Sequence, residues 1–422
     1  MSPGLMTTKE CREAFDSLDL GVARAQLADL PGVDVPQLRR ERYDRLQAEL
    51  RERDLGAILL YDPINIRYAT DCRNMQVWTM HNSARYCLVP ADGNAVIFDY
   101  VNCEHLSAGI ETIGETRPAT LWFFHSAGQK RSALIDRWAD ELAEVITETC
   151  HNRNVAIDRL DMDARIALEQ RQISISFGQD VIEYARSIKT PEELKAQLHS
   201  AQVCQAGLAK LKEITGPGIT ENELWATFGA INAALGGDYV ETRLLVAGPR
   251  TNPWYTEASN RPVQAGELVA FDTDMIGPYG YSTDISRSWL CPVATPSEEQ
   301  KTLYKLAHEQ VHHNMALLKA GLSFRELAEK SWRIPDRFAE LEVGVVVHGI
   351  GMCNEYPQVA PLKWFEQTGY DGHFVENMTV SVESYIGQSG GAEGVKLEEM
   401  VRITASGSEL VAHFPFEDEL LR

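Results

Sequence analysis

Six ionisable residues in the last third of the chain constrain its fold most strongly: Asp272, Asp274, Asp284, His348, Glu383 and Glu398. Most of them lie at the ends of apolar, strand-like runs, which are LVAFDTD, VVVHGIG, TVSVES and GVKLEEM. Desolvating an unpaired carboxylate costs several kcal/mol, whereas divalent cations offset that cost for several carboxylates at once. The pattern therefore predicts a fold that gathers these strand ends around two metal ions.

The spacing of the three aspartates supports a shared site. Asp272 and Asp274 are separated by one residue, and alternate residues of a strand face the same side. The Gly- and Pro-containing stretch 277–280 follows and predicts a hairpin that returns Asp284 to the same place. One imidazole among five carboxylates suits a pair of Mn, Fe, Co or Zn ions better than a structural zinc site, in which thiolates dominate.

A second metal motif competes with this set. HEQVH, from His308 to His312, matches the HExxH helix signature of zinc proteases. It lies in TLYKLAHEQVHHNMALLKAG, which predicts an amphipathic helix with both histidines on one face. The pattern is short, so a solvated or partly packed helix face is the alternative explanation.

Two segments near the candidate ligands could complete a pocket. Gly349 and Gly351 permit close backbone approach beside His348, and Glu355 follows at a spacing that could support the site. Another segment, TRLLVAGPRTNPWYTE, ends a strand in a Gly-Pro turn and exposes Arg250, Asn252, Trp254 and Tyr255. This turn is either packed or a pocket wall, and the pairing of Trp with Arg favours a recognition surface.

The chain is long enough to predict two domains, because 422 residues exceed what one hydrophobic core usually supports. Residues 33–160 alternate helical and strand-like patterns, which indicates an α/β domain. Thr190 in a cap position and Pro191 at the first helical position mark a strong helix start. We therefore expect an α/β (α+β) protein with domains at 1–186 and 187–422.

Composition limits the partners. Lys+Arg 40 against Asp+Glu 61 gives a net charge of -21, which disfavours nucleic acid and anionic membrane surfaces. The N-terminus shows no signal-peptide pattern, and no run of about 18 apolar residues occurs. The eight cysteines are dispersed without a CxxC pair. These features predict a cytoplasmic protein with reduced thiols.

Several segments resemble the creatinase/prolidase family of metalloenzymes, in family order and over nearly the whole chain. They are RSIKTPEEL, GYSTDISRSW, HGIG before Glu-Tyr-Pro, VES and KLEEMVRIT. Within that family, YDPINIRYATDCRNMQVW, VETRLLVAGPRTNPW and FDTDMIGPYGYSTDISRSW are most similar to the DddP-type dimethylsulfoniopropionate (DMSP) lyases.

The resemblance implies an N-terminal creatinase-like domain and a C-terminal catalytic domain of the pita-bread fold. It gives the six residues named first the roles of ligands to two metal ions. It also implies a homodimer in which Trp78 and His81 approach the neighbouring active site. Burial of these two residues within their own domain is the alternative.

The resemblance also shows where this chain departs from its relatives. The family's peptidases use two further histidines, at places held here by Asn252-Pro253-Trp254 and by Asn354. The DMSP lyases carry an aspartate, taken as the catalytic base, where Asn354 stands, and a tyrosine where Val343 stands. An amide has no useful basicity near neutral pH. The chain is therefore an inactivated variant or a divergent branch, and Val343 favours the divergent branch.

Three functions stay open. The first is a metal-assisted lyase that binds a substrate carboxylate, with hydroxide on the metals or Glu355 as the base. The second is hydrolysis of a C–N bond in a small amide or Xaa-Pro-like compound, with Arg250 or Trp254 holding the substrate. The third is a pseudoenzyme that retains the pocket for binding.

Overall fold

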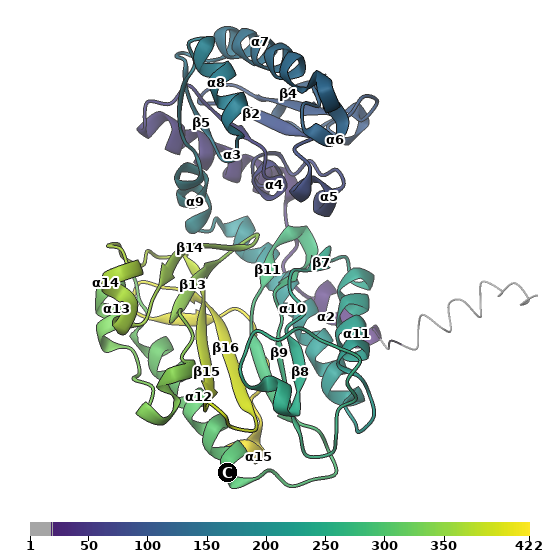
Figure 1. Ribbon diagram of the computed structural model, residues 1–422, viewed down its shortest axis with the longest axis vertical. Coiled ribbons are helices and arrows are strands. Elements are labelled where there is room, and N and C mark those ends of the chain that lie inside the picture. The colour runs from purple at the N-terminus through teal and green to yellow at the C-terminus, as the bar shows by residue number, and fades with distance from the viewer. Residues whose placement is uncertain (1–17, 19) are drawn as a thin grey trace, which may run out of the picture. The chain divides into compact units, whose positions relative to one another are not determined.

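The chain forms two compact units, described here from a computed structural model that covers residue 18 and residues 20–422 (Figure 1). One unit is Val33–Glu192, and the other joins the described residues up to Gly32 to Glu193–Arg422. Two domains are thus confirmed. The ranges 1–186 and 187–422 stay predictions, and residues 1–17 and 19 lie outside the described residues.

The Val33–Glu192 unit is built on a mixed six-stranded sheet of order β4-β3-β2-β1-β5-β6. Strand β1 pairs antiparallel with β2 and parallel with β5. All four residues of β1 are buried, which agrees with its continuous apolar sequence AILL. The strands are β1 Ala57–Leu60, β2 Tyr86–Pro90, β3 Ala95–Asp99, β4 Ile113–Pro118, β5 Asn154–Ile157 and β6 Ser174–Phe177.

Helices cover both faces of this sheet. Helices α7 and α8 lie on one side and α3 and α4 on the other (Figure 1). Trp138 of α7 is fully buried and centres a core shared by α7, α8 and the sheet. The helices are α3 Val35–Glu52, α4 Pro63–Thr70, α5 Gln76–His81, α6 Phe124–Ala127, α7 Arg131–Thr149, α8 Met162–Gln170 and α9 Gln179–Ser187, with 3-10 turns η1 Glu104–Leu106 and η2 Gly128–Lys130.

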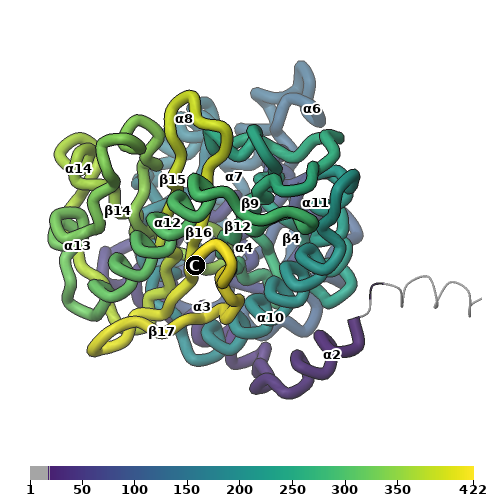
Figure 2. The backbone as a smooth tube through the Cα atoms, turned by 90° about the horizontal axis from the view of Figure 1, so that it is seen from below, coloured from purple at the N-terminus to yellow at the C-terminus, as the bar shows by residue number. Residues whose placement is uncertain are grey.

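The other unit contains three sheets, of orders β11-β10-β7, β12-β9-β8 and β14-β13-β15-β16-β17. Strands β9 and β16 lie side by side, so two of the sheets meet there (Figures 1 and 2). The strands are β7 Tyr239–Val240, β8 Leu245–Ala247, β9 Leu268–Asp272, β10 Met275–Ile276, β11 Ser282–Thr283, β12 Ser286–Leu290, β13 Val347–Ile350, β14 Asn354–Val359, β15 Thr379–Gly387, β16 Gly394–Ile403 and β17 Ser408–Leu410.

Helices α10 and α11 contribute to the core beside β8 and β9, and α12 packs on β15 and β16. Capping boxes begin α11 at Thr220 and α12 at Ser297. The helices are α2 Gly21–Ala28, α10 Pro191–Ile214, α11 Glu221–Ala234, α12 Glu298–Leu317, α13 Phe324–Lys330, α14 Leu362–Thr368 and α15 Asp418–Leu421, with 3-10 turns η3 Gly248–Thr251, η4 Pro278–Gly280 and η5 Asp336–Leu341.

The long elements expected from sequence periodicity are confirmed, including the helix that begins at Pro191 and the hairpin before Asp284. In that hairpin Met275 pairs with Thr283 and Ile276 with Ser282. Short helices such as α4 and α13 were not expected from the sequence. Among the described residues, no helix combines the length and the apolarity that crossing a bilayer requires.

Two glycines in adjacent helices allow a matched test of this packing. A Cβ at Gly207 of α10 would lie 2.6 Å from Phe228 ring atoms, whereas a Cβ at Gly229 of α11 meets nothing within 4 Å. Gly207→Ala is therefore expected to lower the free energy of unfolding by about 1–3 kcal/mol through overpacking. Gly229→Ala should raise it by about 0.5–1 kcal/mol. Urea denaturation measures both, and equal effects would contradict the packing described here.

Candidate metal centre

All six predicted metal ligands lie in the C-terminal unit and are buried. Asp272 is the last residue of β9, Asp284 lies between β11 and β12, and His348 is in β13. The other two strands of the site are paired so that Glu383 of β15 stands directly opposite Glu398 of β16. The antiparallel register therefore brings together acids that are far apart in sequence.

The strand argument for Asp274 is wrong, although Asp274 does join the site. Strand β9 ends at Asp272, and Asp274 follows with a φ of +34°. Thr242 donates a hydrogen bond of 2.7 Å from Oγ1 to Asp274 Oδ2. An irregular link between β9 and β10, rather than strand alternation, thus brings Asp274 beside Asp272.

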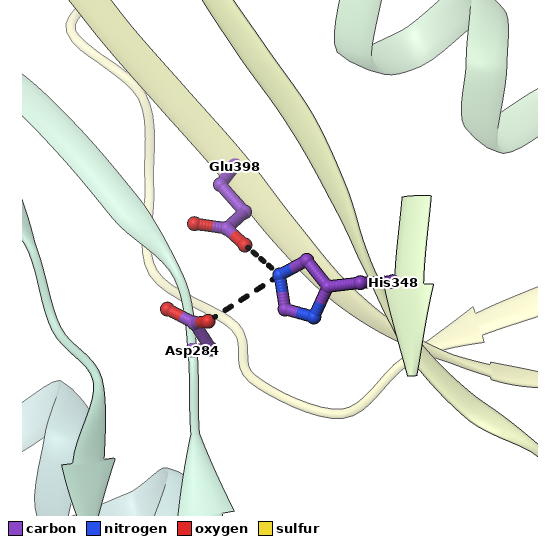
Figure 3. Close-up of side chains that lie close together, drawn as sticks. All are labelled: Asp284, His348 and Glu398. Carbon is purple, nitrogen blue, oxygen red and sulfur yellow. Dashed lines mark ion pairs between the residues drawn. The ribbon is translucent and has the colours of Figure 1, made fainter. Parts of the chain in front are cut away.

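His348 directs one ring nitrogen at three carboxylates, of which Figure 3 shows those of Asp284 and Glu398. Its Nε2 lies 3.6 Å from Asp284 Oδ2, 3.4 Å from Glu383 Oε1 and 3.5 Å from Glu398 Oε1. Its Nδ1 lies 3.1 Å from the Gly349 carbonyl oxygen, which can only accept a hydrogen bond. Nδ1 therefore carries a proton, and Nε2 is the nitrogen available to a metal.

Ligand atoms converge in two overlapping triads. One atom from each of Asp284, His348 and Glu398 lies within 4.8 Å of the others, and the same holds for Asp272, Asp274 and Asp284. Asp284 belongs to both triads. Two neighbouring cations that share a carboxylate would match this arrangement.

Lys396 is a buried residue of the site that the sequence analysis missed. Its Nζ lies 2.7 Å from Glu383 Oε2, 3.0 Å from Glu398 Oε2 and 3.2 Å from Asp272 Oδ2. Ser286 Oγ hydrogen-bonds to both Asp272 and Glu398. Strand alternation could have found Lys396, because it stands two residues before Glu398 and so faces the same side of β16.

The electrostatics show that the cluster favours added positive charge. Burial and the Asp272 carboxylate raise the pKa of Asp274 to about 7. Burial and the neighbouring carboxylates hold the pKa of Asp284 well above its usual range. Burial would lower the pKa of His348, but Glu383 and Glu398 raise it well above its usual value. A divalent cation would relieve this carboxylate repulsion.

The residues present therefore fit a metal centre. Asp284 Oδ1 and Glu398 Oε1 are buried oxygens without a hydrogen-bond partner among the described residues. An oxygen-rich donor set with one imidazole nitrogen suits divalent ions such as Mn, Fe, Co or Zn. When bound, such ions would be held by Asp272, Asp274, Asp284, His348, Glu383 and Glu398.

Glu221 holds the two sides of the loop that follows β8, which carries the predicted pocket-wall residues Arg250, Asn252, Trp254 and Tyr255. It is the first residue of α11 and is fully buried. Its carboxylate accepts hydrogen bonds from the backbone N–H groups of Ala247 and Ser259, each at 2.9 Å. Arg250 donates from Nε to the same carboxylate at 3.1 Å. Arg250 thus lies in a structural ion pair, and its role toward substrate stays a prediction.

Asn252 fastens the middle of the same loop to the β15–β16 hairpin. Its Nδ2 donates to the carbonyl oxygens of Gln388, at 2.7 Å, and Gly391, at 2.9 Å. Its Oδ1 accepts a hydrogen bond of 2.9 Å from the hydroxyl of Tyr385. Asn252 therefore holds the loop against the hairpin, and its correspondence to a histidine of the peptidases stays a prediction.

Trp254 and Val343, two predicted substrate-binding residues, pack in one hydrophobic cluster. The Trp254 ring stacks on Tyr385 with centroids 6.0 Å apart, and Lys396 Nζ lies 5.9 Å from its centroid. Trp254 therefore borders the metal centre from beneath the lysine. Tyr255 follows with a φ of +68° and is exposed.

The remaining predicted residues are spread over two units. Asn354 begins β14 and is exposed, whereas the adjacent Glu355 is buried, as strand alternation requires. A Cβ at Gly351 would lie 2.4 Å from the Glu355 carboxylate, so Gly351 is needed for that close approach. Trp78 and His81 lie on α5 of the other unit, where Trp78 is partly exposed and packs near Tyr100.

The competing HExxH motif forms an aromatic contact on α12. The rings of His308 and His312 lie 3.9 Å apart, and both pack near Phe416. Burial and His312 lower the pKa of His308 to about 4. No third candidate ligand joins this pair among the described residues. The partly packed helix face is therefore the better explanation.

Family comparisons identify both domains. Residues 195–405 match the metallopeptidase family M24, and residues 42–198 match the creatinase/prolidase N-terminal domain. The chain belongs to the M24 family. The family resemblance and the two-domain pita-bread fold expected from it are thus confirmed.

The relatives of this M24 protein include a lyase and a dipeptidase. It is 36% identical over 394 residues to the dimethylsulfoniopropionate lyase DddP of Roseovarius nubinhibens, covering 92% of this chain and 88% of the relative. It is 26% identical over 384 residues to the Xaa-Pro dipeptidase of Lactobacillus helveticus, covering 88% of this chain and 96% of the relative.

Among solved structures, the M24 protein resembles the Xaa-Pro dipeptidase of Bacillus anthracis. The TM-score is 0.71 at 22% identity, over 90% of this chain and 99% of that one. At this identity the likeness shows the fold alone.

The metal centre predicts a difference between two sets of variants. After dialysis against Mn²⁺, the wild-type protein should retain two equivalents per chain. Asp284→Asn should retain fewer than one, because Asp284 belongs to both ligand triads. The double variant His308→Ala/His312→Ala should still retain two. Elemental analysis measures all three, and metal loss only in the histidine variant would contradict the assignment.

Proposed function

We propose that the chain is a metal-dependent lyase that cleaves DMSP, or a closely related β-substituted carboxylate, by elimination. The observation that carries this proposal is the 36% identity to DddP over 92% of the chain. The geometry of Asn252 supports it, because a bracketing amide offers no imidazole for the proton transfers of peptide hydrolysis.

Elimination of dimethyl sulfide from DMSP requires a base and a group that stabilises the substrate carboxylate. A base removes the proton on the carbon α to the carboxylate, and a Cα=Cβ double bond forms. The Cβ–S bond breaks with its electron pair moving to sulfur, so dimethyl sulfide and acrylate leave. Two divalent ions, when bound, would supply Lewis-acid charge to the substrate carboxylate. The chain's own residues must then orient the substrate and accept the proton.

This chain differs from the DMSP lyases at the position expected for the catalytic base. Asn354 is exposed at the start of β14 and cannot accept the proton as an amide. Glu355 is the adjacent ionisable residue, but it is buried and faces the other side of the strand. We therefore propose a divergent substrate or a slow reaction, in which Glu355 would act from the opposite face of β14.

The other features of the proposed enzyme rest on the sequence. The substrate would be a small carboxylate bound near Val343, Trp254 and Arg250. A homodimer and a cytoplasmic location are proposed with it. Trp78 and His81 would then approach the partner's site.

Hydrolysis of a C–N bond is the second candidate. The Xaa-Pro dipeptidase relatives, such as that of Lactobacillus helveticus at 26% identity, favour it. The same fold and metal ligands would serve such a reaction. The missing histidines make it the weaker candidate.

The test is release of dimethyl sulfide from DMSP by the Mn²⁺- or Fe²⁺-loaded protein, measured by gas chromatography. We expect slow release by the wild-type protein. Asn354→Asp should raise kcat/KM about 100-fold, because a positioned base contributes about 10²–10⁴ in rate. Asn354→Ala is the matched control and should give no rise.

If none of the three proteins releases dimethyl sulfide while a panel of dipeptides and N-acyl amino acids is hydrolysed, the lyase proposal is wrong and the hydrolase is correct.

A further inference from the structure

Lys396 occupies a central position among the candidate ligands. It is the third residue of the buried strand β16 and is 2% exposed. Its ammonium group contacts one oxygen of each of Asp272, Glu383 and Glu398, and donates a hydrogen bond of 2.7 Å to Ser286 Oγ. The lysine thus touches three of the six candidate ligands directly.

The two glutamates divide their oxygens between two groups. Glu383 and Glu398 each turn Oε1 toward His348 Nε2, at 3.4 and 3.5 Å. Each turns Oε2 toward Lys396 Nζ, at 2.7 and 3.0 Å. The ammonium therefore fixes the rotation of both carboxylates and leaves one oxygen of each beside the imidazole.

The net charge of the five carboxylates and Lys396 matches the charge of two divalent ions. Asp272, Asp274, Asp284, Glu383 and Glu398 contribute five negative charges when ionised, and Lys396 contributes one positive charge. The remaining four negative charges equal the charge of two divalent ions. Without the lysine, the site would carry one uncompensated negative charge even with both ions bound.

The lysine is held where it is by its surroundings. The backbone of Lys396 is fixed to β12 through Ser288, whose Oγ donates to its carbonyl oxygen at 2.9 Å and accepts from its N–H at 3.1 Å. The Trp254 ring lies beneath the ammonium at 5.9 Å. A fixed cation of this kind needs no rearrangement before it pairs with the carboxylates.

We propose that Lys396 is a tethered cation of the ligand cluster. It holds Asp272, Glu383 and Glu398 together before metal binds, and it competes with divalent ions for the negative charge of these carboxylates. Lys396 is therefore a positioning residue that sets metal affinity. This inference rests on the proposed metal centre.

The test compares the melting temperature of the full-length protein with and without Mn²⁺. Lys396→Met should lower that of the metal-free protein by about 5–10 °C, because it leaves buried carboxylates unpaired. Mn²⁺ should then stabilise Lys396→Met more than the wild-type protein, with a dissociation constant about tenfold lower by calorimetry. Lys396→Arg keeps the charge and should restore the wild-type behaviour.

Lys301→Met is the matched control, because Lys301 is a lysine of α12 whose contact is an ion pair with the exposed Glu298. It should change neither melting temperature nor Mn²⁺ affinity. A purely structural role for Lys396 would lower the melting temperature equally with and without Mn²⁺. That result, or weaker Mn²⁺ binding by Lys396→Met, would overturn the proposal.

A double-mutant cycle tests the charge pairing without metal. Glu383→Gln combined with Lys396→Met removes both members of the 2.7 Å pair, so the double variant should melt above Lys396→Met alone. If Lys396→Met does not fold without Mn²⁺, a cooperative metal-free melt of the double variant takes the place of the cycle and would support the proposal. Additive losses in the cycle would overturn it. No response of the wild-type protein to Mn²⁺ would instead overturn the metal centre.

Discussion

Repulsion among five buried carboxylates is the constraint on which the rest of this structure depends. Asp272, Asp274, Asp284, Glu383 and Glu398 lie in one cluster, and only His348 and Lys396 offset their charge among the described residues. Burial of that many acids is unfavourable unless cations or protons accompany them. The fold therefore has to hold the carboxylates on rigid strands beside His348 and Lys396, and the site has to bind cations.

Strand pairing and side-chain hydrogen bonds hold the carboxylates and the neighbouring loop in place. The β15–β16 register sets Glu383 opposite Glu398, and Ser286 of β12 hydrogen-bonds to Asp272 and Glu398 together. The loop after β8 is held to α11 by Glu221 and to the β15–β16 hairpin by Asn252. Glu221 and Asn252 therefore act as structural residues that fix this loop in place.

The sequence predicted the parts of the site that depend on strong local patterns. Apolar runs ending in acids revealed the strands, and the Gly/Pro stretch 277–280 revealed the hairpin before Asp284. The break in the strand at Asp274 could not be predicted, because an FDTD run fits a continuing strand equally well. Lys396 was missed for another reason: a single lysine in GVKLEEM resembles a surface residue until its strand is known to be buried on both faces. The long-range bonds of Asn252 and Glu221 leave no sequence signal.

A crystal structure of the protein soaked with Mn²⁺, with anomalous scattering recorded at the manganese edge, would show whether the carboxylate cluster binds two metal ions. Two peaks about 3.5–4 Å apart, with Asp284 as a shared ligand, are the predicted result. A single peak at His308 and His312, or no ordered peak beside His348, would contradict the claim that this carboxylate cluster is a dinuclear metal centre.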